Sequence, residues 1–160
     1  MTGRDSGETV PVQVWRLGRD EEDEDVILLR DNAGRVLPVW IAPCEAAAIW
    51  LRLEHEQVRS VVRRPMTHDL LLAIIERLGM AVERIVIDDL ANGTYYATLH
   101  LQRNGEPFTI DARPSDAIAL SLRAEVPVLV AEEIMRQAGE VVDEGQQIEP
   151  EEGPGDVDPD

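Results

Sequence analysis

Residues 64–70 of this chain read Arg-Pro-Met-Thr-His-Asp-Leu, and residues 110–117 read Ile-Asp-Ala-Arg-Pro-Ser-Asp-Ala. Each motif holds an arginine, a carboxylate and a hydroxyl that can cap a helix, directly before or within an apolar pattern with helical spacing. Backbone N–H groups and the helix dipole favour anions at a helix start. Two helix starts of this kind can together build one polar site.

The sequence after each motif predicts a helix with a defined start. The first is expected to begin with Thr67 as its N-cap and to end at Gly79, and the second is expected to span residues 116–123 with Ser115 as its N-cap. The first helix carries five apolar residues on one face, namely Leu70, Leu71, Ile74, Ile75 and Leu78. That face is expected to pack against the body of the protein.

The rest of the chain alternates between strand and helix patterns. Strands are predicted at residues 10–17, 26–30, 36–41, 82–90, 95–102, 107–111 and 126–130, and two further helices at residues 44–57 and 132–138. Strand runs and helices are segregated, without a βαβ repeat. The predicted fold class is therefore α+β: a single compact domain with antiparallel or mixed sheets and about four helices.

Composition sets the domain boundaries and the expected compartment. A chain of 160 residues with 44% hydrophobic residues can form one domain, which we expect to span residues 10–139. Residues 1–9 are polar and are expected to be flexible, and residues 140–160 are too acidic and too rich in Pro and Gly to fold. No membrane-spanning or signal segment is evident, which indicates a cytoplasmic protein. Cys44 is the only cysteine, so no intramolecular disulfide is possible, and we expect it to be a small buried apolar residue.

The formal net charge of −17 argues at first against a nucleic-acid ligand. However, six acidic residues are consecutive at 20–25 and nine more lie in residues 140–160, which leaves 17 acidic residues against 15 bases in the rest of the chain. All the bases are arginines. Because arginine binds phosphate with two parallel hydrogen bonds, a few of them suffice for a phosphate site in a nearly neutral body.

The two motifs resemble those of a known family. The chain is similar to the bifunctional nucleases, whose members pair Arg-Pro-x-Thr-His-Asp-Leu with Asp-Ala-Arg-Pro-Ser-Asp-Ala, and the resemblance covers roughly residues 10–139. It implies a nuclease that acts on DNA and RNA. It also implies a wedge-like homodimer with the active site in a groove at the thick end. No membrane partner is expected, because no segment is long and apolar enough to span a membrane.

The residues of the two motifs fit a hydrolytic nuclease, which must neutralise a phosphate and generate a nucleophile. The candidate catalytic residues are His68, Asp69, Asp111 and Asp116. Asp69, Asp111 and Asp116, together with Glu45, would offer oxygen ligands to Mg²⁺ or Mn²⁺. The candidate phosphate-binding residues are Arg59, Arg63, Arg64 and Arg113. His68 would be a general base or a further ligand, and hydrolysis assisted by histidine without a metal is the alternative. No organic cofactor is expected.

Simpler interpretations exist for several of these residues. Thr67 and Ser115 are expected to cap helices and position the site, not to react. Asp116 in a first turn would gain stability from the helix dipole alone. The alternative from another class is a non-catalytic module that binds a small anion or a protein. Salt dependence separates the two, because binding to a polyanion weakens steeply with salt.

Overall fold

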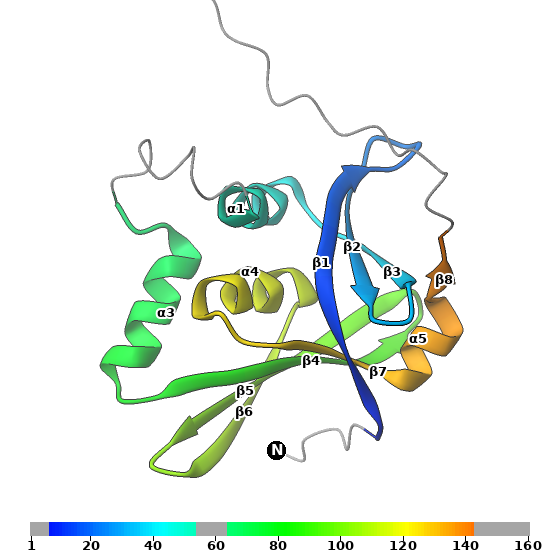
Figure 1. Ribbon diagram of the computed structural model, residues 1–160. Helices are drawn as coiled ribbons and strands as arrows, with labels where there is room; N and C mark the ends of the chain where they lie inside the picture. Colours follow the sequence, from blue (N-terminus) through cyan, green and yellow to red (C-terminus); the bar gives the residue numbers. More distant parts are fainter. Residues whose placement is uncertain (1–6, 54–63, 143–160) are drawn as a thin grey trace, which may run out of the picture.

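The computed structural model describes residues 7–53 and 64–142, which form a single α+β domain. Its centre is an eight-stranded mixed sheet in the order β6-β5-β4-β7-β1-β2-β3-β8 (Figure 1). The strands are β1 (Thr9–Arg19), β2 (Asp25–Asp31), β3 (Arg35–Trp40), β4 (Ala81–Ala91), β5 (Thr94–Arg103), β6 (Glu106–Ala112), β7 (Val128–Ala131) and β8 (Glu140–Val141). The helices of the described residues are α1 (Pro43–Leu53), α3 (Thr67–Arg77), α4 (Pro114–Ala124) and α5 (Glu132–Ala138). The predicted fold class is confirmed.

The sheet combines two antiparallel meanders. β1, β2 and β3 pair antiparallel at one side, and β4, β5 and β6 do so at the other. β7 joins them, because it pairs parallel with β4 and antiparallel with β1. Asn92 and Gly93 both have positive φ angles in the turn between β4 and β5, as a tight hairpin with primed turn geometry requires.

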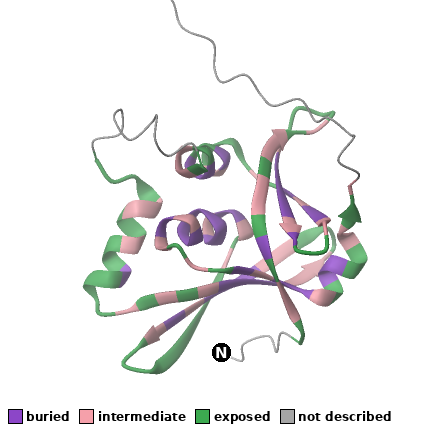
Figure 2. Cartoon of the chain, in the orientation of Figure 1, coloured by how far each residue is buried: buried purple, intermediate pink, exposed green. Residues whose placement is uncertain are grey.

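Helix α4 is the centre of the core. It lies between α1 and the strands β4 and β5, and Figure 2 shows it buried along almost its whole length. Ile118 and Leu120 are fully or almost fully buried, and they share the core with Ile85 and Ile87 of β4 and Leu101 of β5. The apolar side chains of α4 pack against both the sheet and the other helices. This packing fixes the position of the helix and of the polar residues at its two ends.

Helix α3 packs more loosely than its sequence predicted. Of its apolar residues only Ile75 is buried, whereas Leu70, Leu71, Ile74 and Leu78 are exposed. Figure 2 shows the contrast with α4. The helical period was predicted correctly, and the helix ends before Gly79, which has a φ of 75°. The expectation that the whole apolar face packs against the body was wrong, because α3 lies at the margin of the fold and meets mainly one neighbour, α4.

The two helix caps were also predicted wrongly. α3 begins at Thr67 with Met66 as N-cap, and α4 begins at Pro114 with Arg113 as N-cap, in both cases without a side-chain cap hydrogen bond from that residue. In α3 the carboxylate of Asp69 accepts the N–H of Met66, so a hydroxyl at position 67 is not needed as a cap. In α4 the proline occupies the first helical position, where its fixed φ and missing N–H are tolerated, and Ser115 is therefore already inside the helix.

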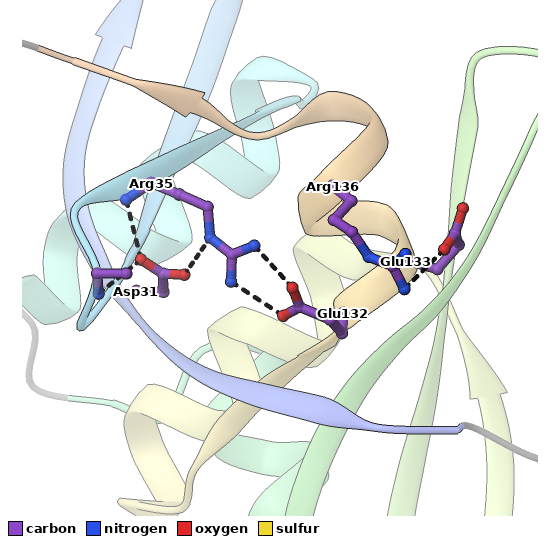
Figure 3. Close-up of polar contacts among 6 residues, drawn as sticks. Asp31, Arg35, Glu132, Glu133 and Arg136 are labelled. Atoms are coloured by element: carbon purple, nitrogen blue, oxygen red, sulfur yellow. Dashed lines mark hydrogen bonds and ion pairs between the residues drawn. The ribbon is translucent and has the colours of Figure 1, made fainter.

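Helix α5 is attached to the strands β2 and β3 by an ion-pair network. Arg35 donates from Nε to Asp31 (2.7 Å) and from its two terminal nitrogens to Glu132 at 2.8 and 2.9 Å. We call Asp31, Arg35 and Glu132 the Arg35 clamp (Figure 3). The ends of the domain lie beside it, because the N–H of Glu132 donates to the carbonyl of Glu8.

The ordered domain is slightly longer than predicted at both ends. Thr9 belongs to β1, and Glu140 and Val141 form β8, which pairs with Arg35 and Val36 of β3. Glu140 and Val141 form a strand because they pair with the edge of β3, although the segment that they begin is acidic. The remainder of the predicted tail, residues 143–160, and most of the predicted N-terminal segment lie outside the described residues.

Two further features bear on the expectations above. Cys44 is exposed, not buried, because residues 42–44 at the start of α1 lie outside the core and the buried side chains of this helix begin at Ala46. Within the described residues, none of the helices is both long enough and apolar enough to span a membrane.

Candidate active site at three helix ends

The helices α1, α3 and α4 lie on one side of the sheet (Figure 1), and polar side chains from all three form hydrogen bonds with one another. α1 contributes from its first turn, α3 from its first turn, and α4 from its N-cap, its first turn and its last turn. We call the resulting network the helix-end cluster; its members are Glu45, His68, Asp69, Arg113, Asp116 and Arg123. The two sequence motifs are thus in contact, as predicted from the two helix starts.

The contact between the motifs is a hydrogen bond between a histidine and a carboxylate. Nε2 of His68 lies 3.0 Å from Oδ1 of Asp116. Burial on its own would raise the pKa of Asp116, but hydrogen bonds from Arg113 and His68 outweigh it and hold the pKa below its ordinary value. The carboxylate is therefore ionised at neutral pH and accepts, so Nε2 of His68 donates. In the neutral imidazole Nδ1 is then the free proton acceptor.

Arg113 links this pair to helix α1. Its Nε donates to Asp116 Oδ2 at 2.7 Å, and one terminal nitrogen donates to Glu45 Oε1 at 2.7 Å. The hydrogen bonds to Asp116 and Glu45 raise the pKa of Arg113 above its ordinary value. The side chain is nevertheless 63% exposed. Since a guanidinium has five N–H donors, Arg113 can hold both carboxylates and still present donors to a phosphate.

Glu45 has one oxygen without a partner. Oε1 accepts from Arg113, whereas Oε2 is buried and has no hydrogen-bond partner among the described residues. A buried carboxylate oxygen that lacks a donor costs free energy. Such an atom is satisfied when a water or a substrate hydroxyl approaches it.

Arg123 joins the other side of the cluster to the core. Its side chain is 4% exposed, and its Nε donates to Asp69 Oδ1 at 2.8 Å. The other nitrogens donate to two backbone carbonyls, that of Ala119 at 2.8 Å and that of Ala48 at 3.1 Å. Burial would raise the pKa of Asp69, but the N–H of Met66 and the charge of Arg123 outweigh it and lower the pKa.

The sequence analysis did not identify Arg123. A signal was present: Arg123 follows Asp116 by seven residues, or two helical turns, so the two lie on the same face of α4. Within a helix otherwise lined by Ala, Ile and Leu, an arginine on the inner face indicates a buried partner. The partner, Asp69, is distant in the sequence and became evident only in the folded chain.

Other predicted site residues do not join the described hydrogen bonds of the cluster. Asp111 lies on the exposed edge strand β6, opposite Thr98 of β5, and its side chain is not without a partner. Arg64 is exposed just before α3. Arg59 and Arg63 lie outside the described residues. Phosphate binding by these arginines stays a prediction, as does a catalytic role for Asp111.

The described residues do not by themselves form a divalent-cation site. In residues 7–53 and 64–142, no three His, Cys, Asp or Glu side chains gather in a way that could hold a metal ion. The carboxylates of the helix-end cluster pair with guanidinium groups, Asp69 with Arg123 and Asp116 with Arg113. Arginine thus supplies the positive charge next to these carboxylates, in the place where a divalent cation would otherwise bind.

Comparison with known proteins places the same region in one family. Residues 26–143 match the model of the bifunctional nuclease domain. An uncharacterized protein of Mycobacterium tuberculosis is 44% identical over 119 residues, which are 74% of this chain and 68% of that protein. Bifunctional nuclease 1 of Oryza sativa subsp. indica is 31% identical over 130 residues, 79% of this chain and 38% of the plant protein. Bifunctional nuclease 2 of Arabidopsis thaliana is 24% identical over 125 residues, 76% of this chain and 37% of its own length.

Proposed function

Because the chain belongs to the bifunctional nuclease domain family, we propose that it hydrolyses phosphodiester bonds of DNA and RNA without sequence specificity, and that the helix-end cluster is its active site. The observation that carries the proposal is the 3.0 Å hydrogen bond between His68 and Asp116, which joins the two motifs across two helices. The plant relatives that are named nucleases support the activity, although this chain spans only 38% of the rice protein.

In the proposed reaction His68 is the general base. Asp116 accepts a hydrogen bond from Nε2–H and so fixes the tautomer, and Nδ1 takes a proton from the attacking water as the water oxygen bonds to phosphorus. The P–O bond to the leaving oxygen breaks, and the imidazolium returns the proton to that oxygen. An aspartate that orients a histidine in this way also stabilises the imidazolium that forms. Arg113 contacts the phosphate with the N–H groups that Asp116 and Glu45 leave free. Arg64, with Arg59 and Arg63 before it, extends the contacts to neighbouring phosphates.

A specific observation also favours a protein partner, and we propose that the partner is a second copy of the chain. The outer face of α3 exposes Leu70, Leu71, Ile74 and Leu78, and a shallow hollow lined by Ala73, Ile74, Glu76 and Arg77 lies on the same helix. Contiguous apolar surface of this kind is typical of an interaction site. The homodimer is compatible with catalysis, whereas a pure interaction module would use this face and leave His68 without a role.

The test is cleavage of single- and double-stranded DNA and RNA by the purified protein, with Mg²⁺, Mn²⁺ or EDTA. His68→Gln and Asp116→Asn should each lower the rate by roughly a hundredfold or more, which is the usual contribution of a general base. The control is Arg136→Gln, whose side chain is 64% exposed on α5 and pairs only with Glu133 in the described contacts. Equal cleavage by all four proteins, or none by the wild type, would overturn the proposed activity. Cleavage in EDTA would show that no added metal is required.

A further inference from the structure

Helix α3 needs an anchor if His68 is to meet Asp116. Ile75 of α3 is buried two turns after His68, and Leu72, one turn after His68, is partly buried against the core. Leu70 is exposed, so apolar packing holds the helix mainly beyond its first turn. Its described polar attachments other than His68 run through Asp69, the next residue in the chain.

Asp69 binds two partners with its two oxygens. Oδ2 accepts the N–H of Met66 at 2.9 Å, which fixes the first turn of α3 from within. Oδ1 accepts from Nε of Arg123 at 2.8 Å, which fixes the same turn to α4. His68 lies in the chain between Met66 and Asp69, the two residues joined by the first hydrogen bond. The direction of the His68 side chain therefore depends on the hydrogen bonds of Asp69 to Met66 and to Arg123.

Arg123 is in turn held by the two central helices. Its terminal nitrogens donate to the carbonyl of Ala119 in α4 and to the carbonyl of Ala48 in α1. The guanidinium is almost fully buried and makes all three contacts at 3.1 Å or less. Arginine is the one side chain with enough donors in a rigid plane to make these bonds at once.

We infer that Arg123 and Asp69 are positioning residues of the proposed active site: by fixing the first turn of α3 to α1 and α4, they hold the imidazole of His68 against Asp116. The inference rests on the proposed function for its catalytic meaning, and it assigns Asp69 a role that needs no metal. Neither Arg123 nor Asp69 then has to touch the substrate. Loss of either should loosen the contact between His68 and Asp116 without removing any atom of that pair.

The first readout is the tautomer of His68, measured by ¹⁵N NMR of the imidazole at neutral pH. His68→Gln assigns the signals among the three histidines of the chain. We expect the wild type to hold the proton on Nε2, and Asp69→Asn and Arg123→Lys to give a mixture of the two tautomers. Asp116→Ala, which removes the acceptor itself, gives the reference for a released ring.

The control variant must destabilise the fold without changing any residue of the helix-end cluster. Arg35→Gln breaks an ion-paired arginine in the Arg35 clamp and should leave the His68 signals unchanged. The second readout is kinetic: Asp69→Asn and Arg123→Lys should lower kcat about tenfold or more while KM changes less than threefold. The combined Asp69→Asn and Arg123→Lys variant should lose little more than either alone, because both act through one contact.

The outcomes separate the two proposals. If the variants are folded by circular dichroism and His68 keeps one tautomer in them, the positioning role is overturned whatever the activity. If the tautomer mixes in the variants but the wild-type protein cleaves no substrate, the positioning role stands and the proposed nuclease function fails. Asp69→Asn keeps the result decisive if Arg123→Lys does not fold, since the side chain of Asp69 is 36% exposed and the change is nearly isosteric.

Discussion

The helix-end cluster and the Arg35 clamp are built from the same kinds of residue and differ in what they leave unsatisfied. In the clamp, Arg35 directs three nitrogens at two carboxylates, and the remaining oxygen of Asp31 accepts two backbone N–H groups at 2.9 Å. The helix-end cluster contains a histidine, an exposed arginine and a buried carboxylate oxygen without a partner. A network in which every charged group is paired, such as the Arg35 clamp, stabilises the contact between two elements. A network with unpaired donors or acceptors, such as the helix-end cluster, can also bind a ligand.

The two networks also differ in what they connect. The clamp ties the turn between β2 and β3 to helix α5, so it closes the fold near the chain ends. The helix-end cluster ties three helix ends to each other, where backbone N–H groups already favour an anion. Ion-pair geometry alone therefore does not distinguish the two networks, whereas the polar atom left without a partner among the described residues does.

The largest effect is expected where the helix-end cluster reaches into the core. Arg123→Met should lower the free energy of unfolding by about 3 kcal/mol or more, because it leaves Asp69 and two buried carbonyls without their donor. Urea unfolding followed by circular dichroism measures this. The matched control Arg136→Met, in an exposed pair, should change the stability by less than about 0.5 kcal/mol. A loss below 1 kcal/mol for Arg123→Met would show that the cluster is not anchored through this residue.

A smaller effect is expected for the clamp, and it should be confined to stability. Arg35→Met should lower Tm by roughly 5 °C, since it removes hydrogen bonds between charged groups that are only partly screened by solvent. Nuclease activity measured well below Tm should stay at the wild-type value. A loss of activity in a folded Arg35→Met protein would erase the distinction between the two networks.

Acid should weaken both networks. The folded-state pKa values of Asp31, Asp69, Asp116 and Glu132 all lie below their ordinary values. Depressed carboxyl pKa values stabilise the fold above the unfolded-state pKa, near 4, and this stabilisation is lost as the pH falls through the lower folded-state values. The share of the unfolding free energy that these carboxylates supply should therefore stay level above about pH 5 and fall below about pH 4, measured from pH 7 to pH 3. In Arg35→Met the acid decline should be shallower, and an equally steep decline would contradict this origin.

The smallest effect on the folded protomer is expected on the outer face of α3. Ile74→Ser together with Leu78→Ser should change the protomer stability by less than about 0.5 kcal/mol, because both side chains are exposed. If this face binds a second copy, sedimentation velocity should show a dimer for the wild type and a monomer for the double variant. The exchange Glu83→Ser on β4 is the matched surface control. Identical sedimentation of all three proteins would place any dimer contact elsewhere.

Local patterns in the sequence predicted most of the elements. The strands predicted at residues 82–90 and 95–102 are the paired strands β4 and β5. Ala97, Leu99 and Leu101 alternate along β5, and they are buried. Helix α5 has the predicted boundaries. These features depend on neighbours within a few residues, and for that reason a sequence pattern is sufficient to predict them.

The candidate site was only partly predictable. The two motifs indicated one polar region, and His68 and Asp116 of these motifs are in hydrogen-bond contact. The helix caps, the exposure of α3 and the role of Arg123 were missed. Each of these depends on which groups from distant parts of the chain satisfy a backbone N–H, cover a face or pair with a charge.

Local sequence patterns were sufficient to predict the α+β class and the order of the elements, and they contain the two motifs, because hydrophobic period and turn chemistry are local properties. Three features became evident in the packed fold alone: Asp116 accepts from both His68 and Arg113, Arg123 is buried against Asp69, and one oxygen of Glu45 has no partner among the described residues. Hydrogen bonds across three helices form only after the sheet and α4 have fixed the positions of their ends. The residues of the candidate site are therefore present in the two motifs and in Arg123, but their hydrogen-bond partners become evident only in the packed fold.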